Sequence, residues 1–249
     1  MPLDHAGTSR SIGCGRDSIA MNEQALLRPY TGIYEISDAA RIVQVGSRFP
    51  ERPPYPVNNR HIIRWIRKGL ALPQLADVPG GALYISFEDL ISMRVIALLR
   101  AVGITWDKIY TAERWLRDYT GVDRPFASRE LWTAGPDIFL DREGALIAAS
   151  MGGQYPFPDL VERYLVPVAG LTFNRLRLAD SWMPKDHILL TPDVQFGAPC
   201  VRQTRIPTRT LWDMNQGGDS IPFIARVYRL DREQVEEAIE WENQLEEAA

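Results

Sequence analysis

Cysteine, histidine and long apolar runs are all scarce in this chain. Its 249 residues include two cysteines, Cys14 and Cys200, and three histidines, His5, His61 and His187. Two isolated cysteines make neither a disulfide framework nor a C-x-x-C pair, and the histidines lack the spacing of metal ligands. No run approaches the roughly 18 consecutive apolar residues of a membrane span. These absences predict a cytoplasmic protein without a membrane segment or a metal site.

Motifs of catalysis are also missing. The sequence has no G-x-S-x-G, no phosphate-cradling glycine loop and no H-E-x-x-H. Asp180, Asp186 and Asp193 could be considered a metal cluster, but aspartate is common in loops. The N-terminus contains Asp4 and no long apolar core, so it does not read as a secretory signal. We therefore expect no enzymatic activity, no catalytic residues and no cofactor.

Charge is unevenly placed along the chain. The formal net charge is −4, so any binding of nucleic acid must come from a local patch. Residues 41–68 contain seven cationic side chains and only one acid, Glu51. Residues 231–249 contain eight carboxylates and only one cation, Arg232. Phosphates should therefore be attracted to the first segment and repelled by the second.

Helical spacing dominates the first half of the chain. Residues 1–28 lack apolar periodicity and are expected to form a disordered tail, whereas residues 29–121 are expected to form one domain. Apolar residues recur at helical intervals in four segments, and a turn at 79–81 predicts a β-hairpin over 72–87. The expected helices cover residues 34–43, 57–70, 90–102 and 106–119.

The second expected helix has one apolar face and one cationic face. No acidic residue occurs from 58 to 76, although an ordinary surface helix mixes both signs. A helix of this kind can enter the major groove, where Arg reads guanine and Asn reads adenine. The alternatives are that the charges form a solvated face and that the two asparagines cap the helix. The predicted DNA-binding residues are Asn58, Asn59, Arg60, Arg64, Arg67 and Lys68.

The segment from Tyr34 to Phe87, with the helix after it, resembles the MerR-type regulators. The resemblance places the first helix of a winged helix-turn-helix at residues 34–40 and Arg64-Trp65-Ile66-Arg67 in the second. The connection over 46–56 is longer than the usual tight turn. We expect Trp65 to pack in the core and not to contact a base.

The second half of the chain is expected to be a mixed linking region over 122–185 followed by a helical module over 186–247. In the linking region the patterns predict short helices over 128–133 and 160–166 and strands over 138–140, 145–147 and 171–178. The module should contain three helices, with Ser220 and Asp231 as N-caps. These helices are expected over 208–216, 221–228 and 232–245.

A dense set of backbone constraints precedes those three helices. The run from Gly197 to Pro207, preceded by Thr191-Pro192-Asp193 and followed by Gly218 and Ser220, resembles domain-of-unknown-function family 433 over about residues 186–245. One departure is Gln203, where the family usually has glycine. Glycine permits a positive φ that glutamine accepts less easily, so the loop shape could differ there.

The two modules together resemble the longer VapB-type antitoxins. This resemblance implies a type II antitoxin that represses its own operon and neutralises a PIN-family ribonuclease toxin, working as a homodimer. The acidic end makes the rear module a poor reader of DNA and favours protein contacts. The candidate partner or dimer contacts are Arg202, Thr204, Arg205 and Trp241. Arg205 and Thr204 could equally staple the loop, and Val235 and Ile239 could simply fill the module's core.

Two rival functions remain open on the sequence. One is a MerR-like transcription regulator with a small-molecule effector site in residues 122–190, and the other is an interaction module without a DNA role. All of these share one expected fold class, mainly α with small β-hairpins (α+β). It consists of an N-terminal winged helix-turn-helix and a C-terminal three-helix module of helix-turn-helix form.

Overall fold

The computed structural model describes residues 32–46, 55–70, 83–101, 103–129, 131 and 170–248. The chain divides into two compact units, Met1–Tyr30 and Thr31–Ala249, and the description below concerns the second. The expected tail over 1–28, the turn at 79–81, the strands at 138–140 and 145–147 and the helix at 160–166 lie outside the described residues.

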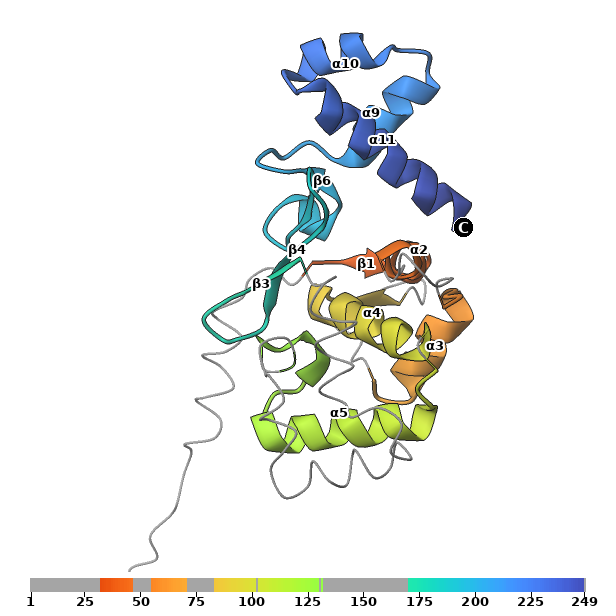
Figure 1. The fold of residues 1–249 in the computed structure, drawn as a ribbon, viewed down its shortest axis with the longest axis vertical. Helices are drawn as coiled ribbons and strands as arrows, with labels where there is room; N and C mark the ends of the chain where they lie inside the picture. Colours follow the sequence, from red (N-terminus) through yellow and green to blue (C-terminus); the bar gives the residue numbers. More distant parts are fainter. Residues whose placement is uncertain are drawn as a thin grey trace, which may run out of the picture. The chain divides into compact units, whose positions relative to one another are not determined.

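Helices dominate the first part of this unit (Figure 1). The helices predicted over 34–43, 57–70, 90–102 and 106–119 are confirmed with shifted ends, because apolar periodicity locates a helix without fixing its terminal residues. Gly121 ends α5 in the left-handed conformation, with φ 68°, as expected of a glycine stop. The elements are β1 (Tyr34–Glu35), α2 (Ile36–Gly46), α3 (Asn59–Arg67), β2 (Tyr84–Ile85), α4 (Phe87–Ala101), α5 (Trp106–Thr120) and η1 (Pro125–Ala127).

Strand β2 pairs with β1, which lies about fifty residues earlier in the chain. The pairing is antiparallel, with Tyr34 opposite Ile85 and Glu35 opposite Tyr84. The sequence predicted a hairpin over 72–87, whose first strand and turn lie outside the described residues. A two-residue strand carries too little alternation to specify this distant partner. The helices that follow the two strands, α2 and α4, pack against each other.

Helix α4 is the centre of this half of the molecule. Its residues from Phe87 to Leu99 are all buried, and among the described elements α4 packs against α2, η1 and β4. Ser86 and Asp89 form a reciprocal cap at its start. Asp89 also forms an ion pair with Arg124, whose Nε lies 2.8 Å from Asp89 Oδ1. Trp65 is fully buried with its ring centroid 6.0 Å from that of Trp106, so its expected packing role is confirmed.

A four-stranded antiparallel sheet begins the C-terminal part. Its strand order is β3-β4-β5-β6, built from β3 (Leu171–Phe173), β4 (Ala179–Lys185), β5 (Ile188–Leu190) and β6 (Cys200–Val201). The predicted strand over 171–178 is therefore too long, and β4 and β5 were not predicted. The polar residues and Pro184 in β4 hide the period-two pattern, and its register shifts twice against its neighbours.

Three helices follow the sheet, as predicted. They are α9 (Thr208–Gln216), α10 (Ile221–Tyr228) and α11 (Arg232–Glu247), and η5 (Gln195–Gly197) lies before β6. Asp231 forms a capping box with Gln234, which confirms it as an N-cap. Ser220 stands at the N-cap of α10, but its side chain makes no cap hydrogen bond. Small antiparallel sheets among a majority of helices confirm the α+β fold class.

Candidate nucleic-acid interface and the C-terminal loop

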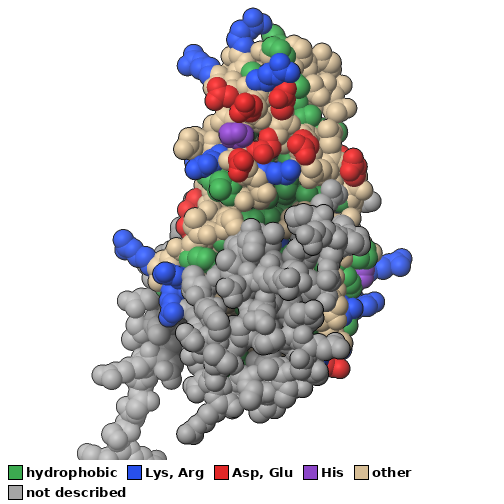
Figure 2. Space-filling view, viewed as in Figure 1, with side chains coloured by type: hydrophobic (Ala, Val, Ile, Leu, Met, Phe, Trp, Pro, Cys, Tyr) green, Lys and Arg blue, Asp and Glu red, His purple; other side chains and the backbone are tan. Residues whose placement is uncertain are grey.

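The cationic face of α3 points away from the core. All six predicted DNA-binding residues are exposed, while Ile62 and Trp65 on the opposite face are buried. At the edge of the molecule where Figure 1 shows α3, Lys, Arg and His side chains project outward (Figure 2). A three-residue spacing of Arg64 and Arg67 places both guanidinium groups on this face.

Asn58 caps α3, one of the two roles expected of it. Its Oδ1 accepts a 3.2 Å hydrogen bond from the backbone N–H of His61, and its own N–H donates to His61 Nδ1 at 3.3 Å. Burial, with a contribution from the Arg64 charge, lowers the pKa of His61, which keeps Nδ1 free to accept. The oxygen of Asn58 is thus engaged in the helix cap, so Asn59 remains the candidate of this pair for a base contact.

The cations of α3 differ from those of the C-terminal helices in their surroundings. Among the described residues, no carboxylate makes an ion pair with Arg60, Arg64, Arg67 or Lys68. By contrast, Arg232 Nε lies 2.6 Å from Glu236. The cations of α3 therefore keep their positive charge available for phosphates, whereas the charge of Arg232 is compensated.

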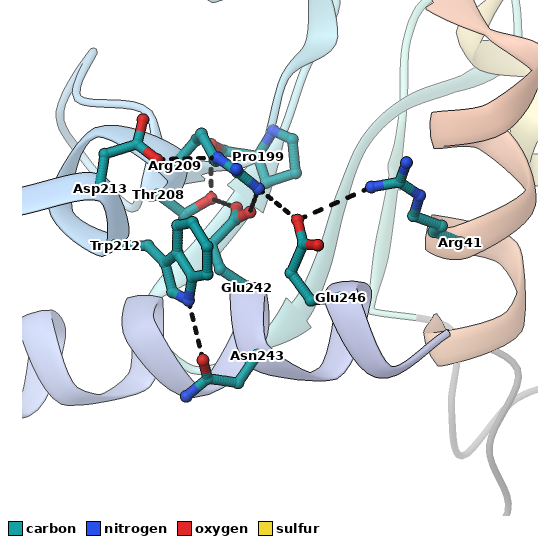
Figure 3. Close-up of polar contacts among 9 residues, drawn as sticks. All are labelled: Arg41, Pro199, Thr208, Arg209, Trp212, Asp213, Glu242, Asn243 and Glu246. Atoms are coloured by element: carbon teal, nitrogen blue, oxygen red, sulfur yellow. Dashed lines mark hydrogen bonds and ion pairs between the residues drawn. The ribbon is translucent and has the colours of Figure 1, made fainter. Parts of the chain in front are cut away.

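Arg209 is surrounded by carboxylates at the junction of α9, α11 and α2 (Figure 3). It contacts Asp213 at 3.1 Å, Glu242 at 3.9 Å and Glu246, and Glu246 also lies 3.8 Å from Arg41 of α2. Figure 2 shows Asp and Glu side chains gathered over the C-terminal helices. This surface is acidic even where arginine is present, which disfavours phosphate binding by α11.

Glu242 is the most buried carboxylate of this cluster, with 4% of its surface exposed. It accepts a hydrogen bond from the hydroxyl of Thr208, whose backbone N–H is bonded to the carbonyl of Pro199 at 2.9 Å. Burial raises the pKa of Glu242 above its ordinary 4.5, and the Thr208 hydrogen bond and the Arg209 charge act in the opposite direction. The cluster thereby ties the start of α9 and its preceding loop to α11.

Glu242→Gln is expected to change how stability depends on pH. The folded carboxyl holds its proton more tightly than the unfolded one, so its contribution is full below pH 4.5 and is lost as pH rises through the folded pKa. Glutamine keeps an acceptor for Thr208 and does not ionise. Chemical denaturation at about pH 5 and about pH 8 should show a smaller loss of stability for the variant than for the wild type. An equal loss in both proteins would contradict this role of Glu242.

The loop from Gly197 to Pro207 is held by its own backbone and by Tyr34. Tyr34 Oη donates a 2.7 Å hydrogen bond to the carbonyl of Gly197, which has φ 94°. Thr204 Oγ1 donates to the carbonyl of Val201 at 2.8 Å and accepts from the N–H of Ile206 at 3.1 Å. Thr204 therefore staples the loop, which is one of the two roles expected of it.

Gln203 keeps the left-handed backbone that glycine would adopt, with φ 63°. The glutamine that stands where the family usually has glycine therefore keeps φ positive. A residue with a Cβ is strained in this backbone region by about 1–2 kcal/mol.

Gln203→Gly is expected to stabilise the protein by about 1 kcal/mol, because it removes that strain. Gln203 is exposed, so no packing is lost. Gln203→Ala is the matched control, since it shortens the side chain and keeps the Cβ, and it should change stability by less than about 0.5 kcal/mol. Urea denaturation measures both. Equal stabilities for the glycine and alanine variants would show that the backbone at this position is not strained.

The two arginines among the candidate partner residues differ from Trp241 in their exposure. Arg202 and Arg205 are exposed and make no ion pair with any described carboxylate, so they remain candidates for contact with an acidic partner. Trp241 is only 1% exposed and packs edge-on against Trp182, with ring centroids 6.3 Å apart. Its expected role as a surface anchor is therefore wrong: the ring fills the junction between α11 and β4. Val235 and Ile239 are also buried in the core, as the alternative interpretation held.

No helix among the described residues is long and apolar enough to cross a membrane. In the same part of the chain, no group of three or more His, Cys, Asp or Glu side chains is placed to hold a metal ion.

Comparison with known proteins supports the C-terminal module. No curated protein matches the chain. The crystal structure of Rv2018 from Mycobacterium tuberculosis has a similar fold, with a TM-score of 0.60 and 17% sequence identity over 83% of this chain and 96% of that chain. Residues 188–241 match the family described as "Protein of unknown function (DUF433)". The resemblance of the C-terminal module to that family is therefore confirmed over these residues.

Proposed function

We propose that this protein is the antitoxin of a bacterial type II toxin–antitoxin system, which binds operator DNA through α3 and neutralises a PIN-family ribonuclease by direct contact. The observation that carries the DNA role is the exposed face of α3, where four cations have no described carboxylate as a partner. The apolar back of α3 packs on α2, as a recognition helix packs on its support.

The match of residues 188–241 to the DUF433 family supports the toxin-binding role, because the antitoxins that the whole chain resembles carry such a module. Arg202 and Arg205 supply exposed positive charge on this module, whereas α11 is acidic. Guanidinium groups suit the carboxylate cluster of a PIN-type active site. A homodimer is expected, because a dimer engages two operator half-sites at once.

Two measurements test this proposal. The purified full chain should bind a duplex from the region upstream of its own coding sequence more tightly than a duplex of unrelated sequence and equal length. It should also stop RNA cleavage by a PIN-family ribonuclease encoded next to it when the two are mixed in equal amounts. Equal affinity for both duplexes contradicts the operator role, and undiminished cleavage contradicts the antitoxin role.

A MerR-like regulator controlled by a small molecule is the second candidate function. The observation in its favour is a cavity of about 440 Å³ whose lining includes Gly170 and residues 182–185, within the segment where an effector site was expected. Binding of DNA without any effect on a ribonuclease would favour this candidate.

A further inference from the structure

Phe196 is the most exposed large apolar side chain among the described residues, with 61% of its surface open to solvent. Its backbone is left-handed, with φ 55°, and the neighbouring Gln195 and Gly197 have φ 49° and 94°. A bulky residue is uncommon in this region, because its Cβ crowds the following carbonyl oxygen. The chain therefore holds an aromatic ring in water at a cost in backbone strain, and such outliers cluster at functional positions.

Hydrogen bonds to distant segments fix the turn that carries this ring. The N–H of Ile33 donates to the carbonyl of Phe196 at 2.9 Å, and Tyr34 Oη donates to the next carbonyl at 2.7 Å. The side chain of Gln195 donates from Nε2 to the carbonyl of Arg205 at 3.1 Å. The ring is thus presented on a preorganised support, so docking costs little conformational entropy.

A cavity of about 570 Å³ lies beside the turn. Its lining includes Ile33, Gln195 and the apolar Pro199 and Leu245, whereas Phe196 does not line it. The cavity opens to solvent, since Ile33 at its edge is 46% exposed. An apolar cavity of about 150 Å³ is enough to bind benzene, so this one has room for a phenyl ring from another molecule.

Unpaired charges of opposite sign stand at the turn and in the cavity. Arg205 is exposed, and no described carboxylate forms an ion pair with it. Asp38 of α2 lines the cavity, is exposed, and has no described cation as an ion-pair partner. The charged lining residues, four of which are labelled in Figure 3, are Asp38, Arg41, Arg209, Glu242 and Glu246. Carboxylates outnumber cations among them, so the cavity attracts an arginine that arrives beside an aromatic ring.

We propose that the face formed by Phe196, Arg205 and this cavity is a dimer interface whose occupant is a second copy of the chain. Because the turn and the cavity are neighbours, a two-fold axis can place the ring of each copy in the cavity of the other, as an isologous interface requires. Arg205 then pairs with Asp38 of the partner subunit, and the ring leaves water. The inference rests on the homodimer of the proposed function and names its interface. Arg202 remains available for the ribonuclease.

Analytical ultracentrifugation of the full chain, without DNA or ribonuclease, tests the interface. The wild type should be dimeric at about 100 µM, and Phe196→Ala should weaken the dimer at least about 30-fold, as at an interface hot spot. Phe223→Ala is the matched control and should leave the dimer unchanged, because this ring is also exposed but lies on α10, outside the cavity lining. A monomeric wild type would refute the homodimer and its interface together. A dimer that survives Phe196→Ala, or that Phe223→Ala weakens equally, would refute the interface alone.

Charge reversal tests which side chains face each other across the two-fold axis. Arg205→Glu and Asp38→Arg should each weaken the dimer by about 10-fold, because each places like charges opposite one another. The double variant restores opposite charges and should recover most of the wild-type affinity. The two side chains form no ion pair within one protomer, so recovery reports a contact between copies. A double variant weaker than both single variants would show that Arg205 and Asp38 do not meet, against the proposed interface.

Discussion

Arg64→Ala combined with Arg67→Ala is expected to weaken binding to the upstream duplex by about 100-fold, since an arginine contact with DNA is worth roughly 1–3 kcal/mol. Both side chains are exposed on α3 and make no described ion pair, so their removal should leave the fold intact. The slope of log affinity against log salt should fall by about 2, because each phosphate contact contributes close to 0.9. Fluorescence anisotropy at several salt concentrations measures both quantities.

Arg226→Ala combined with Arg229→Ala is the matched control for this experiment. These arginines are also exposed, but they lie on or just after α10 in the C-terminal module. Their removal changes the net charge by the same amount, so it corrects for any general loss of positive charge. If the two double variants lose affinity and salt slope equally, the chain attracts DNA by overall charge and α3 is not its reader.

Gly197→Ala is expected to destabilise the protein by about 3–5 kcal/mol, which is exceptional for one methyl group. The residue has φ 94°, where a side chain is strained by about 1–2 kcal/mol. A Cβ there would lie 2.3 Å from Tyr34 Oη, so the buried tyrosine would have to move and lose its 2.7 Å hydrogen bond. Overpacking of this kind typically adds about 1–3 kcal/mol. Chemical denaturation gives the free energy of unfolding.

Two control variants separate the causes of that loss. Gly218→Ala introduces the same methyl group at φ 99°, but nothing lies within 4 Å of its Cβ, so only backbone strain of about 1–2 kcal/mol is expected. Tyr34→Phe removes the hydrogen bond alone, for about 1 kcal/mol. A loss at Gly197 no greater than the loss at Gly218 would mean that the contact with Tyr34 does not hold the loop.

The cationic helix shows how far local sequence signals reach. The three-residue spacing of Arg64 and Arg67 fixes their common face in any α-helix, and Asn58 was expected among the capping residues at its start. The same reasoning located α9, α10 and α11, whose starts follow Pro207, Ser220 and Asp231. Helical spacing and capping depend only on residues within one or two helical turns. They can therefore be recognised without knowledge of the tertiary structure.

The sheet and the cavity could not be predicted in the same way. Strand β4 mixes Asp180, Ser181 and Pro184 with two large apolar residues, and it becomes a strand only because β3 and β5 supply its partners. The cavity beside Phe196 joins residues from Ile33 to Glu246, a separation that no local pattern spans. Phe196 gave no signal, because a phenylalanine is ordinarily buried and nothing local marks this one as exposed.

By itself the sequence determined helices α2 to α5 and α9 to α11, the caps at Asn58 and Asp231, the cationic face of α3 and the family of the C-terminal module. Periodicity, capping and ordered motifs are local properties of the chain. Only the tertiary structure decided that Trp241 is a core residue, that Gln203 retains a positive φ, and that Phe196 lies exposed beside a cavity. The physical reason is that burial depends on which distant segments meet, and the packing of α11 on the sheet and α2 sets those neighbours.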